Sequence, residues 1–295
     1  MQRLITTVLF YIALSLQLFA ADSFAEFDVP GALLTRPFGV NARGQIVGLY
    51  RDATGNHGFL KDGDTYTTIQ VPGAIFTNAT GINARGNIVG RWTDTAGYNH
   101  AYLRTHDGQF TFFDPAAPCV ITRSATVAHG INDVGDIVGR CFDSNKVEHG
   151  FLLRDGALTI LDFPGSLTTD AWMVNNSGEI VGDYTDATGL VHGYLRTADG
   201  QFTSVDFPLV PISSARSINE RGEMTGVYRG SANPNPQTLR GDQGFLLSGQ
   251  EFLTIALPPH GIAMGNLAIS NNGVLVGDYL DDTGGEHGFF IRFRD

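Results

Sequence analysis

The chain has 295 residues, of which 42% are hydrophobic and 17% are charged, so it can bury a core and is not an intrinsically disordered protein. Glycine accounts for 37 residues without a Gly-X-Y period, which excludes collagen and indicates many turns. The formal net charge is −11 and there is no basic stripe, which argues against nucleic acid and anionic membrane surfaces as partners.

The first segment, residues 1–21, has the features of a secretory signal peptide. A basic residue precedes an apolar run at 4–19, and small residues follow at Ala20 and Ala21. Because the run is short for a membrane span, we expect cleavage after one of these alanines rather than retention as an anchor helix. No second apolar run follows, so residues 22–295 are predicted to be a secreted, extracellular or periplasmic protein without a membrane span.

A phrase of the type GINARGNIVG recurs along the rest of the chain, and its anchor is a pair of glycines four residues apart. The intervals between successive anchors are 42, 49, 43, 44 and 51 residues. Self-similarity at this period is typical of solenoids, arrays and propellers. The first glycines of the pairs are Gly44, Gly86, Gly135, Gly178, Gly222 and Gly273.

Each repeat contains four short apolar runs separated by turn signals. In the first unit they are 35–40, 45–50, 58–61 and 66–71, and their alternation and β-branched residues predict strands. Turns such as NARG follow the first run, where Asn and Gly tolerate positive φ, and Asp-Gly turns follow the third run. No helical period is present. Each unit is therefore predicted to be a four-stranded antiparallel meander, which is one blade of a β-propeller.

The two ends of the chain predict how the repeats close. The fourth-strand motif LTILDFPG at Leu158 has a counterpart, FAEFDVPG, that begins at Phe24 before any complete unit, whereas the last unit stops after its third strand. The sequence thus predicts an all-β fold, a single six-bladed β-propeller domain over residues 22–295, built from six repeats of ~45 residues. The N-terminal strand would complete the last blade, and we expect a monomer.

A His-Gly-Phe type motif begins the third strand of five units, and the fifth unit carries Gln243-Gly244-Phe245 instead. Together with the GINxxGxIVG phrase, these units resemble the extracellular HAF repeat family, named for a His-Ala-Phe motif. The resemblance implies an exported bacterial protein and gives no common assigned activity. Some members carry a C-terminal sorting segment, and its absence here favours a freely secreted or periplasmic product. The matching histidines are His57, His100, His149, His192 and His287.

Several units contain an Asp followed by the motif histidine, as in YRDATGNHGF, which would suit acid–base or metal chemistry. Because strands of different blades lie far apart, we predict no metal and no cofactor there. We interpret each of these aspartates as capping its loop and each histidine as hydrogen-bonding the backbone. The acids expected to organise the turn into the next blade are Asp28, Asp114, Asp162 and Asp206.

The two cysteines, Cys119 and Cys141, are separated by 22 residues. Cys141 takes a position held by Tyr or Trp in the other units, and Cys119 lies in the longer connection before the third anchor. In an exported protein they are predicted to form a disulfide, with two buried thiols as the alternative.

The first strand of each blade should line a central channel, and two rings of positions there differ between units. The first ring contains Phe38, Thr80, His129, Trp172, Arg216 and Leu267, and the second contains Arg36, Asn78, Val127, Asp170, Ser214 and Gly265. From these we predict a ligand-binding site with an aromatic platform, cations, a base and an acid, formed by Trp172, Arg216, His129, Arg36 and Asp170. This composition suits a sugar or an acidic polysaccharide. The alternative is that the large side chains plug the channel and the charges pair with one another.

Two insertions indicate which face carries the site. PAAPCVITRS from Pro115 and RGSANPNPQTLRGD from Arg229 both fall in connections after second or fourth strands, which share one face. We refer to it as the insertion-bearing face.

Three functional hypotheses follow, and the first is favoured. It is a secreted binding or interaction module with a carbohydrate or protein ligand on the insertion-bearing face. The second is an extracellular lyase or hydrolase acting on glycans, with His129 as base and Arg216 steadying a carboxylate or oxyanion. The third is a structural surface or matrix protein without a small ligand.

Overall fold

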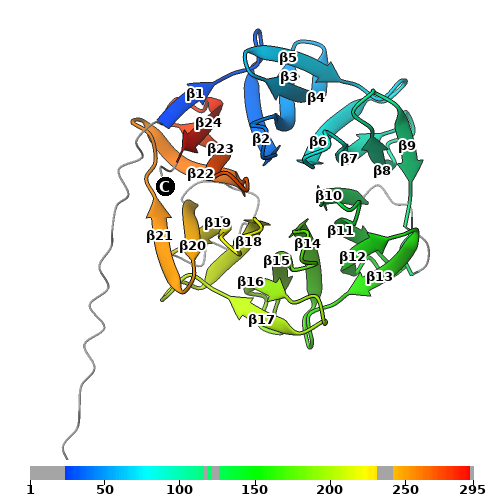
Figure 1. Cartoon of the computed structure of the whole chain (residues 1–295), viewed down its shortest axis with the longest axis vertical. Helices are drawn as coiled ribbons and strands as arrows, with labels where there is room; N and C mark the ends of the chain where they lie inside the picture. Colours follow the sequence, from blue (N-terminus) through cyan, green and yellow to red (C-terminus); the bar gives the residue numbers. More distant parts are fainter. Residues whose placement is uncertain (1–23, 116–117, 121–125, 231–241, 293–295) are drawn as a thin grey trace, which may run out of the picture.

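The computed structural model describes residues 24–115, 118–120, 126–230 and 242–292, and the regular secondary structure there is entirely β (Figure 1). The predicted signal peptide at 1–21 and much of both predicted insertions lie outside these ranges. Over the described ranges, no helix is long and apolar enough to cross a membrane.

The strands follow the predicted four-run pattern of each repeat. In the first repeat, the predicted runs match four strands at nearly the same bounds. The strands are β1 (Phe24–Phe27), β2 (Leu34–Val40), β3 (Ile46–Asp52), β4 (Gly55–Asp62), β5 (Thr65–Ile69), β6 (Phe76–Ile82), β7 (Ile88–Thr93), β8 (Asn99–Arg104), β9 (Phe110–Phe113), β10 (Val127–Ile131), β11 (Ile137–Phe142), β12 (Glu148–Arg154), β13 (Ala157–Leu161), β14 (Thr168–Val174), β15 (Ile180–Thr185), β16 (Val191–Arg196), β17 (Phe202–Val205), β18 (Ile212–Ile218), β19 (Met224–Arg229), β20 (Gln243–Ser248), β21 (Glu251–Ile255), β22 (Gly261–Ile269), β23 (Val274–Asp281) and β24 (Glu286–Arg292).

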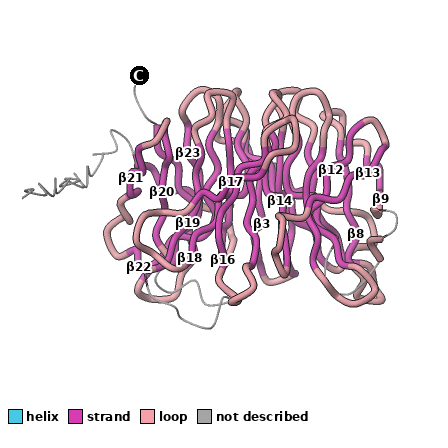
Figure 2. The backbone as a smooth tube through the Cα atoms, turned by 90° about the horizontal axis from the view of Figure 1, so that it is seen from below, coloured by secondary structure: helices cyan, strands magenta, loops and turns pink. Residues whose placement is uncertain are grey.

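The strands form sheets arranged around a central opening, with strands running between two loop-covered faces (Figures 1 and 2). Four sheets have four strands each, in the orders β10-β11-β12-β13, β14-β15-β16-β17, β18-β19-β20-β21 and β1-β24-β23-β22. An eight-stranded sheet contains β2–β5 and β6–β9, which are joined by one parallel pair between Asn56 and Phe76. In the last four-stranded sheet, β1 pairs antiparallel with β24, from Phe24 opposite Ile291 to Phe27 opposite Gly288.

The second glycine of each anchor pair is required by close packing inside the sheet. A Cβ at Gly48 would lie 2.1 Å from the carbonyl oxygen of Arg36 and 2.6 Å from the ring of Phe59. The aromatic residue of the His-Gly-Phe motif therefore packs on this glycine. Each repeat buries one such ring with 0% exposure, and these are Phe59, Tyr102, Phe151, Tyr194, Phe245 and Phe289.

The repeated asparagine after the first strand connects neighbouring sheets. The Oδ1 of Asn83 accepts from the backbone of Arg85 and Asn87, and its Nδ2 donates to the carbonyl of Asn132 at 3.0 Å. Positive φ is adopted by the turn glycines and not by the asparagines, which instead cap the turn with their side chains. The side-chain-to-carbonyl bonds run Asn41 to Asn83, Asn83 to Asn132, Asn132 to Asn175, Asn175 to Asn219, Asn219 to Ser270 and Asn272 to Ala42.

Four of the five motif histidines bond carboxylates, and His57 bonds the amide oxygen of Gln70, so the prediction that they hydrogen-bond the backbone is wrong. The Nδ1 of His149 lies 2.8 Å from Oδ1 of Asp162, because the β12–β13 register places the two residues opposite each other. The loop aspartates do cap, as predicted: Asp143 accepts from the backbone of Val147. The fourth-strand acids Asp28, Asp114, Asp162 and Asp206 are bound to histidines rather than organising the next turn.

Candidate functional site

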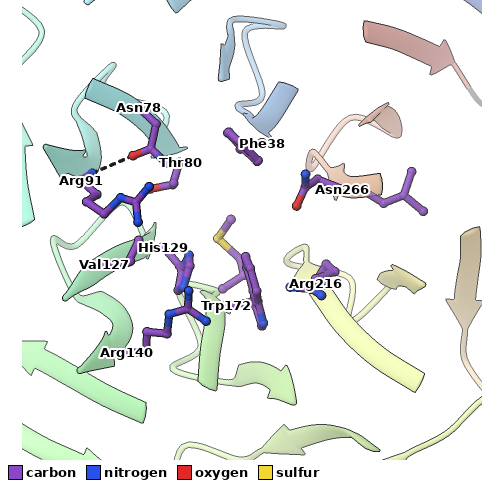
Figure 3. A pocket seen from close by; sticks show the side chains of 12 residues that line it. Phe38, Asn78, Thr80, Arg91, Val127, His129, Arg140, Trp172, Arg216 and Asn266 are labelled. Carbon is purple, nitrogen blue, oxygen red and sulfur yellow. Dashed lines mark hydrogen bonds between the residues drawn. The ribbon is translucent and has the colours of Figure 1, made fainter. Parts of the chain in front are cut away.

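A cavity of ≈170 Å³ lies at the centre of the ring of sheets (Figure 3). Its walls combine cationic, amide and apolar side chains from the innermost strands β2, β6, β10, β14, β18 and β22 and from the neighbouring strands β7 and β11. The lining residues are Phe38, Asn78, Thr80, Arg91, Val127, His129, Arg140, Trp172, Met173, Arg216, Asn266 and Leu267.

A β-bulge in each innermost strand places one non-repeated side chain toward the axis. The strand register shifts on either side of Thr80 in β6 and of Trp172 in β14, for example, and bulges re-aim side chains in this way. In β22 the irregularity lies earlier, between Met264 and Leu267. Asn266 therefore lines the cavity beside Leu267, the residue predicted for this ring, which is only 2% exposed and also packs in the core.

The cavity lies toward the insertion-bearing face of the channel. On β6, Asn78 lies further from the NARG-type turn than Thr80 does. On β7, Arg91 lies further from that turn than Gly90 does. Those turns line a separate depression at the other end of the channel, which includes Asn41 and Asn83. The pocket is thus on the side predicted from the insertions.

Trp172 lies between His129 and Arg216, as Figure 3 shows. The ring centres of Trp172 and His129 are 4.0 Å apart, and the guanidinium carbon of Arg216 lies 3.8 Å from the Trp172 ring centre. The indole Nε1 donates to Asp183 at 2.9 Å. Because both faces of the indole are occupied, Trp172 does not offer the open aromatic platform that the sequence predicted.

His129 and Asp170 form a buried pair behind Trp172. Their side chains are 5% and 2% exposed, and Nε2 of His129 lies 3.3 Å from Oδ1 of Asp170. Neither ring nitrogen of His129 has a directed hydrogen bond to a described residue. Burial lowers the pKa of His129 despite the nearby carboxylate, so the imidazole is neutral at pH 7.

Two of the five predicted site residues do not line the cavity. Asp170 lies beneath it and accepts from Nη1 of Arg140 at 3.1 Å. Arg36 forms a bidentate ion pair with Glu286, in which Nη2 donates to Oε1 at 2.7 Å. This pair links β2 to β24. The structure therefore brings Trp172, His129 and Arg216 together at the cavity and engages the other two in ion pairs.

Arg91 and Arg140 are cavity residues that the sequence analysis missed. Each is paired, on the neighbouring strand, with a residue of the second predicted ring: Arg91 with Asn78, and Arg140 with Val127. Both arginines directly follow the second glycine of an anchor pair. The residue type at this position also differs between repeats, and this variation in the sequence would have indicated them. The residues at this position are Leu49, Arg91, Arg140, Asp183, Val227 and Asp278.

The acids around the cavity lie behind the arginines. Glu148 lies 3.5 Å from Arg140, and burial together with the charge of Asp170 raises the pKa of Glu148 to about 7. Burial also raises the pKa of Asp183, which accepts from Trp172 and Ser214. The arrangement can bind an anion through its arginines and can exchange a proton through Glu148 near neutral pH.

Cys119 and Cys141 are joined by a disulfide with a Cα–Cα distance of 5.6 Å. The next residue, Val120, donates its backbone N–H to the carbonyl of Phe142 at 2.8 Å. These bonds hold part of the first predicted insertion against the end of β11, the strand that carries Arg140.

Within the described ranges, one group of residues has ligand atoms close enough together for a metal ion. It contains Glu26, Asp28 and His287, whose ligand atoms lie within 4.8 Å of one another where β1 meets β24. Nδ1 of His287 lies 2.8 Å from Asp28 and Nε2 lies 3.4 Å from Asp281, so both ring nitrogens already face carboxylates. The group is therefore explained as an ion-pair cluster at the strand junction.

No protein-family model and no curated protein sequence match this chain. It is similar to the structure of a putative TolB from Agrobacterium tumefaciens, with a TM-score of 0.61, 14% identity, and coverage of 91% of this chain and 93% of that one. A TolB from Acinetobacter baumannii gives a TM-score of 0.59 and 12% identity over 85% of this chain, which spans 64% of that protein. The Aleuria aurantia lectin, described as a six-bladed β-propeller, gives a TM-score of 0.51 and 11% identity over 88% of this chain and 93% of the lectin.

The antiparallel sheets around a central opening and these similarities define the fold class as a β-propeller. At such low identity the likeness concerns the fold alone. The function must be argued from the cavity.

Proposed function

We propose that the chain is an exported, six-bladed β-propeller of the HAF-repeat type that acts as a binding module. Its ligand would be a small polar molecule of sugar-ring size, held in the central cavity on the insertion-bearing face. The observation that carries this proposal is the position of the cavity: it lies where the repeats differ, and it is lined by side chains that the fold does not need to repeat.

Six blades and a closed ring are supported by two sets of contacts. The eight-stranded sheet counts as two blades because only the Asn56–Phe76 pair joins its halves. The side-chain bonds that link successive turns also join the last unit to the first, through Asn272 and Ala42 at 3.0 Å. The pairing of β1 with β24 would complete the sixth blade.

The dimensions and chemistry of the cavity favour a small ligand. An engineered cavity of about 150 Å³ binds benzene, so ≈170 Å³ is sufficient for one six-membered ring. Phe38 contributes a half-buried ring that makes no ring–ring contact with another described residue. Asn78 and Asn266 contribute amides, which suit hydroxyl groups. The open aromatic surface is therefore Phe38 rather than Trp172.

The similar structures and the N-terminal sequence support the same proposal. The Aleuria lectin structure is described as showing fucose recognition, which fits a carbohydrate ligand for a propeller of this size. The signal-peptide features of residues 1–21 and the disulfide between Cys119 and Cys141 fit an extracellular or periplasmic location.

A thermal-shift screen of residues 22–295 against neutral and acidic monosaccharides tests the proposal. A ligand at a hundred times its dissociation constant adds about 2.7 kcal/mol, which corresponds to roughly 5–10 °C in Tm for a chain of this size. The shift should disappear in Phe38→Ala and persist in Phe112→Ala, a matched change on the outer strand β9 where the ring is 49% exposed. If no monosaccharide shifts the Tm, a macromolecular partner or a structural role replaces the small-ligand proposal.

A glycan lyase or hydrolase is the second candidate, and the state of His129 favours it. The imidazole is neutral, has no directed hydrogen bond to a described residue and lines the cavity, as a general base requires. If this candidate is correct, His129→Gln abolishes turnover of a bound glycan and retains its binding. Equal turnover by the variant and the wild type would remove it.

A further inference from the structure

We infer that the ligand of the central cavity carries a carboxylate, and that Arg91 is the residue that pairs with it. This inference rests on the proposed function, because it names the chemical class of ligand that the same cavity would take. The class is that of sugar acids, in which one carboxylate is attached to a six-membered ring. The cavity would then select a monoanion over a neutral sugar of the same size.

The guanidinium of Arg91 has no partner in the part of the chain that the structure describes. Its Nε is buried without a hydrogen bond, and no hydrogen bond or ion pair of the other guanidinium nitrogens is present there. The guanidinium makes a cation–π contact with the Phe76 ring, whose centre lies 4.5 Å from the guanidinium carbon. A partly buried cation without a counter-charge is costly, so a fold that retains one at a cavity wall favours a ligand of opposite charge.

The remaining segments cannot supply the missing carboxylate from the insertions. Residues 116–117, 121–125 and 231–241 contain no Asp or Glu. The only acids outside the described ranges are Asp22 and Asp295, at the two ends of the chain. Apart from these two terminal residues, a counter-ion for Arg91 has to come from another molecule.

A second guanidinium lies near Arg91 and strengthens the preference for an anion. Burial and the charge of Arg140 together lower the pKa of Arg91 to about 10, so both arginines are charged at neutral pH. Figure 3 shows Arg91 and Arg140 on the same side of the cavity, with His129 beside them. Two like charges in a partly desolvated site repel each other, and a bound anion would remove that repulsion.

The number of uncompensated charges indicates a carboxylate rather than a phosphate dianion. Arg140 has Asp170 at 3.1 Å, and Arg216 has Asp183 at 3.9 Å. Arg91 is then the single lining arginine without an acidic neighbour among the described residues. One vacant positive charge matches one carboxylate, and a guanidinium accommodates a carboxylate through two parallel hydrogen bonds.

The groups around Arg91 suit the rest of a sugar acid. Asn78 uses Oδ1 to accept from the Arg91 backbone at 2.9 Å, which leaves its amide N–H groups for hydroxyl oxygens. Asn266 donates from Nδ2 to Asp278 at 3.0 Å, which leaves its Oδ1 for a hydroxyl donor. Phe38 would pack against the ring.

The test is isothermal titration of residues 22–295 with D-galacturonate, its uncharged methyl ester and D-galactose. Charge-assisted hydrogen bonds give galacturonate an expected advantage of about tenfold or more over the ester. In Arg91→Met the advantage should disappear, and in Arg91→Lys part of it should remain. The matched control is Arg43→Met on an exposed turn of the opposite face, which should leave the preference unchanged.

A second readout separates this role from a purely structural one. Removing an uncompensated, partly buried cation should leave the Tm of unliganded Arg91→Met equal to or higher than that of the wild type. A lower Tm would mean that the fold itself depends on the Arg91 charge, and the inference would fail.

The outcomes also separate the inference from the proposed function. If galacturonate and its ester bind equally, or if Arg91→Met keeps the preference, the carboxylate is not recognised and the binding-module proposal stands. Tighter binding of inorganic phosphate than of galacturonate would overturn the monoanion assignment. If galacturonate, the ester and galactose all fail to bind, the sugar-acid inference is overturned. If no compound in the whole monosaccharide screen shifts the Tm, the small-ligand proposal is overturned with it.

Discussion

The guanidinium carbon of Arg216 lies 3.8 Å above the ring of Trp172, and the imidazole of His129 lies against the indole with a centre-to-centre distance of 4.0 Å. Three side chains from three different sheets thus form one stack beside the cavity. The indole also donates to Asp183, so Trp172 positions both a cation and an acid. Its role in this structure is to organise the cavity wall rather than to receive a sugar ring.

This stack predicts a large stability loss on truncation of Trp172. Trp172→Ala should lower the free energy of unfolding by about 3–5 kcal/mol, because it removes the ring and one of the two hydrogen-bond donors to Asp183, the other being Ser214. Trp172→Phe keeps an aromatic surface and should cost roughly half as much. Urea unfolding followed by circular dichroism measures both, and a loss under about 1 kcal/mol for Trp172→Ala would contradict the stacking role.

The asparagine bonds between neighbouring turns predict a graded response at Asn83. Asn83→Ala removes the turn cap and the bond to Asn132, with an expected cost of about 2–3 kcal/mol. Asn83→Ser should retain a cap and lose the bond between sheets, as at Ser270, where the hydroxyl accepts from Val274. Its cost should be about 1 kcal/mol. Equal losses in the two variants would show that the bond between sheets contributes nothing.

The disulfide predicts sensitivity to reducing agents. Closing a span of 22 residues contributes about 3 kcal/mol on the chain-entropy account, so reduction of Cys119–Cys141 should lower the Tm. The double variant Cys119→Ser/Cys141→Ser should already have the lower Tm and should not respond to dithiothreitol. A wild-type Tm that is the same with and without dithiothreitol would indicate that the bond adds no stability.

Asp278 predicts a pH dependence of stability. Burial raises its pKa from 3.8 to about 6, so the folded state binds a proton more tightly than the unfolded state. The contribution of this carboxyl is therefore most favourable below pH 4 and is lost as the pH rises from about 4 to about 6. Asp278→Asn, which imitates the protonated form, should be more stable than the wild type at pH 8 by about 2–3 kcal/mol and similar to it at pH 4.

The control for this pH dependence is Asp64→Asn, at an exposed residue in the turn between β4 and β5. Urea unfolding at both pH values should show little change in this control. If Asp278→Asn is less stable than the wild type at pH 8, the charged carboxylate is required, and the inferred cost of its burial is wrong.

The features that the sequence predicted well are those that repeat. The paired glycines, the turn asparagine and the buried aromatic each satisfy a local requirement, such as the 2.1 Å approach of the Arg36 carbonyl to a Cβ at Gly48. Because the same requirement recurs in every unit, the residue type recurs as well, and its period is visible without a structure. Even the β1–β24 pairing follows from a strand motif that appears ahead of the first complete unit.

The site itself depended on the tertiary structure. Its residues lie in repeats separated by about 45 residues, and their partners are determined by which side chains meet at the axis. Only the folded chain shows that Arg36 is bound by Glu286, that both faces of Trp172 are covered, and that Asn266 joins Leu267 at the cavity. The same is true of Arg91, because the absence of a partner among the described residues is a property of its surroundings in space and has no signature in the order of residues.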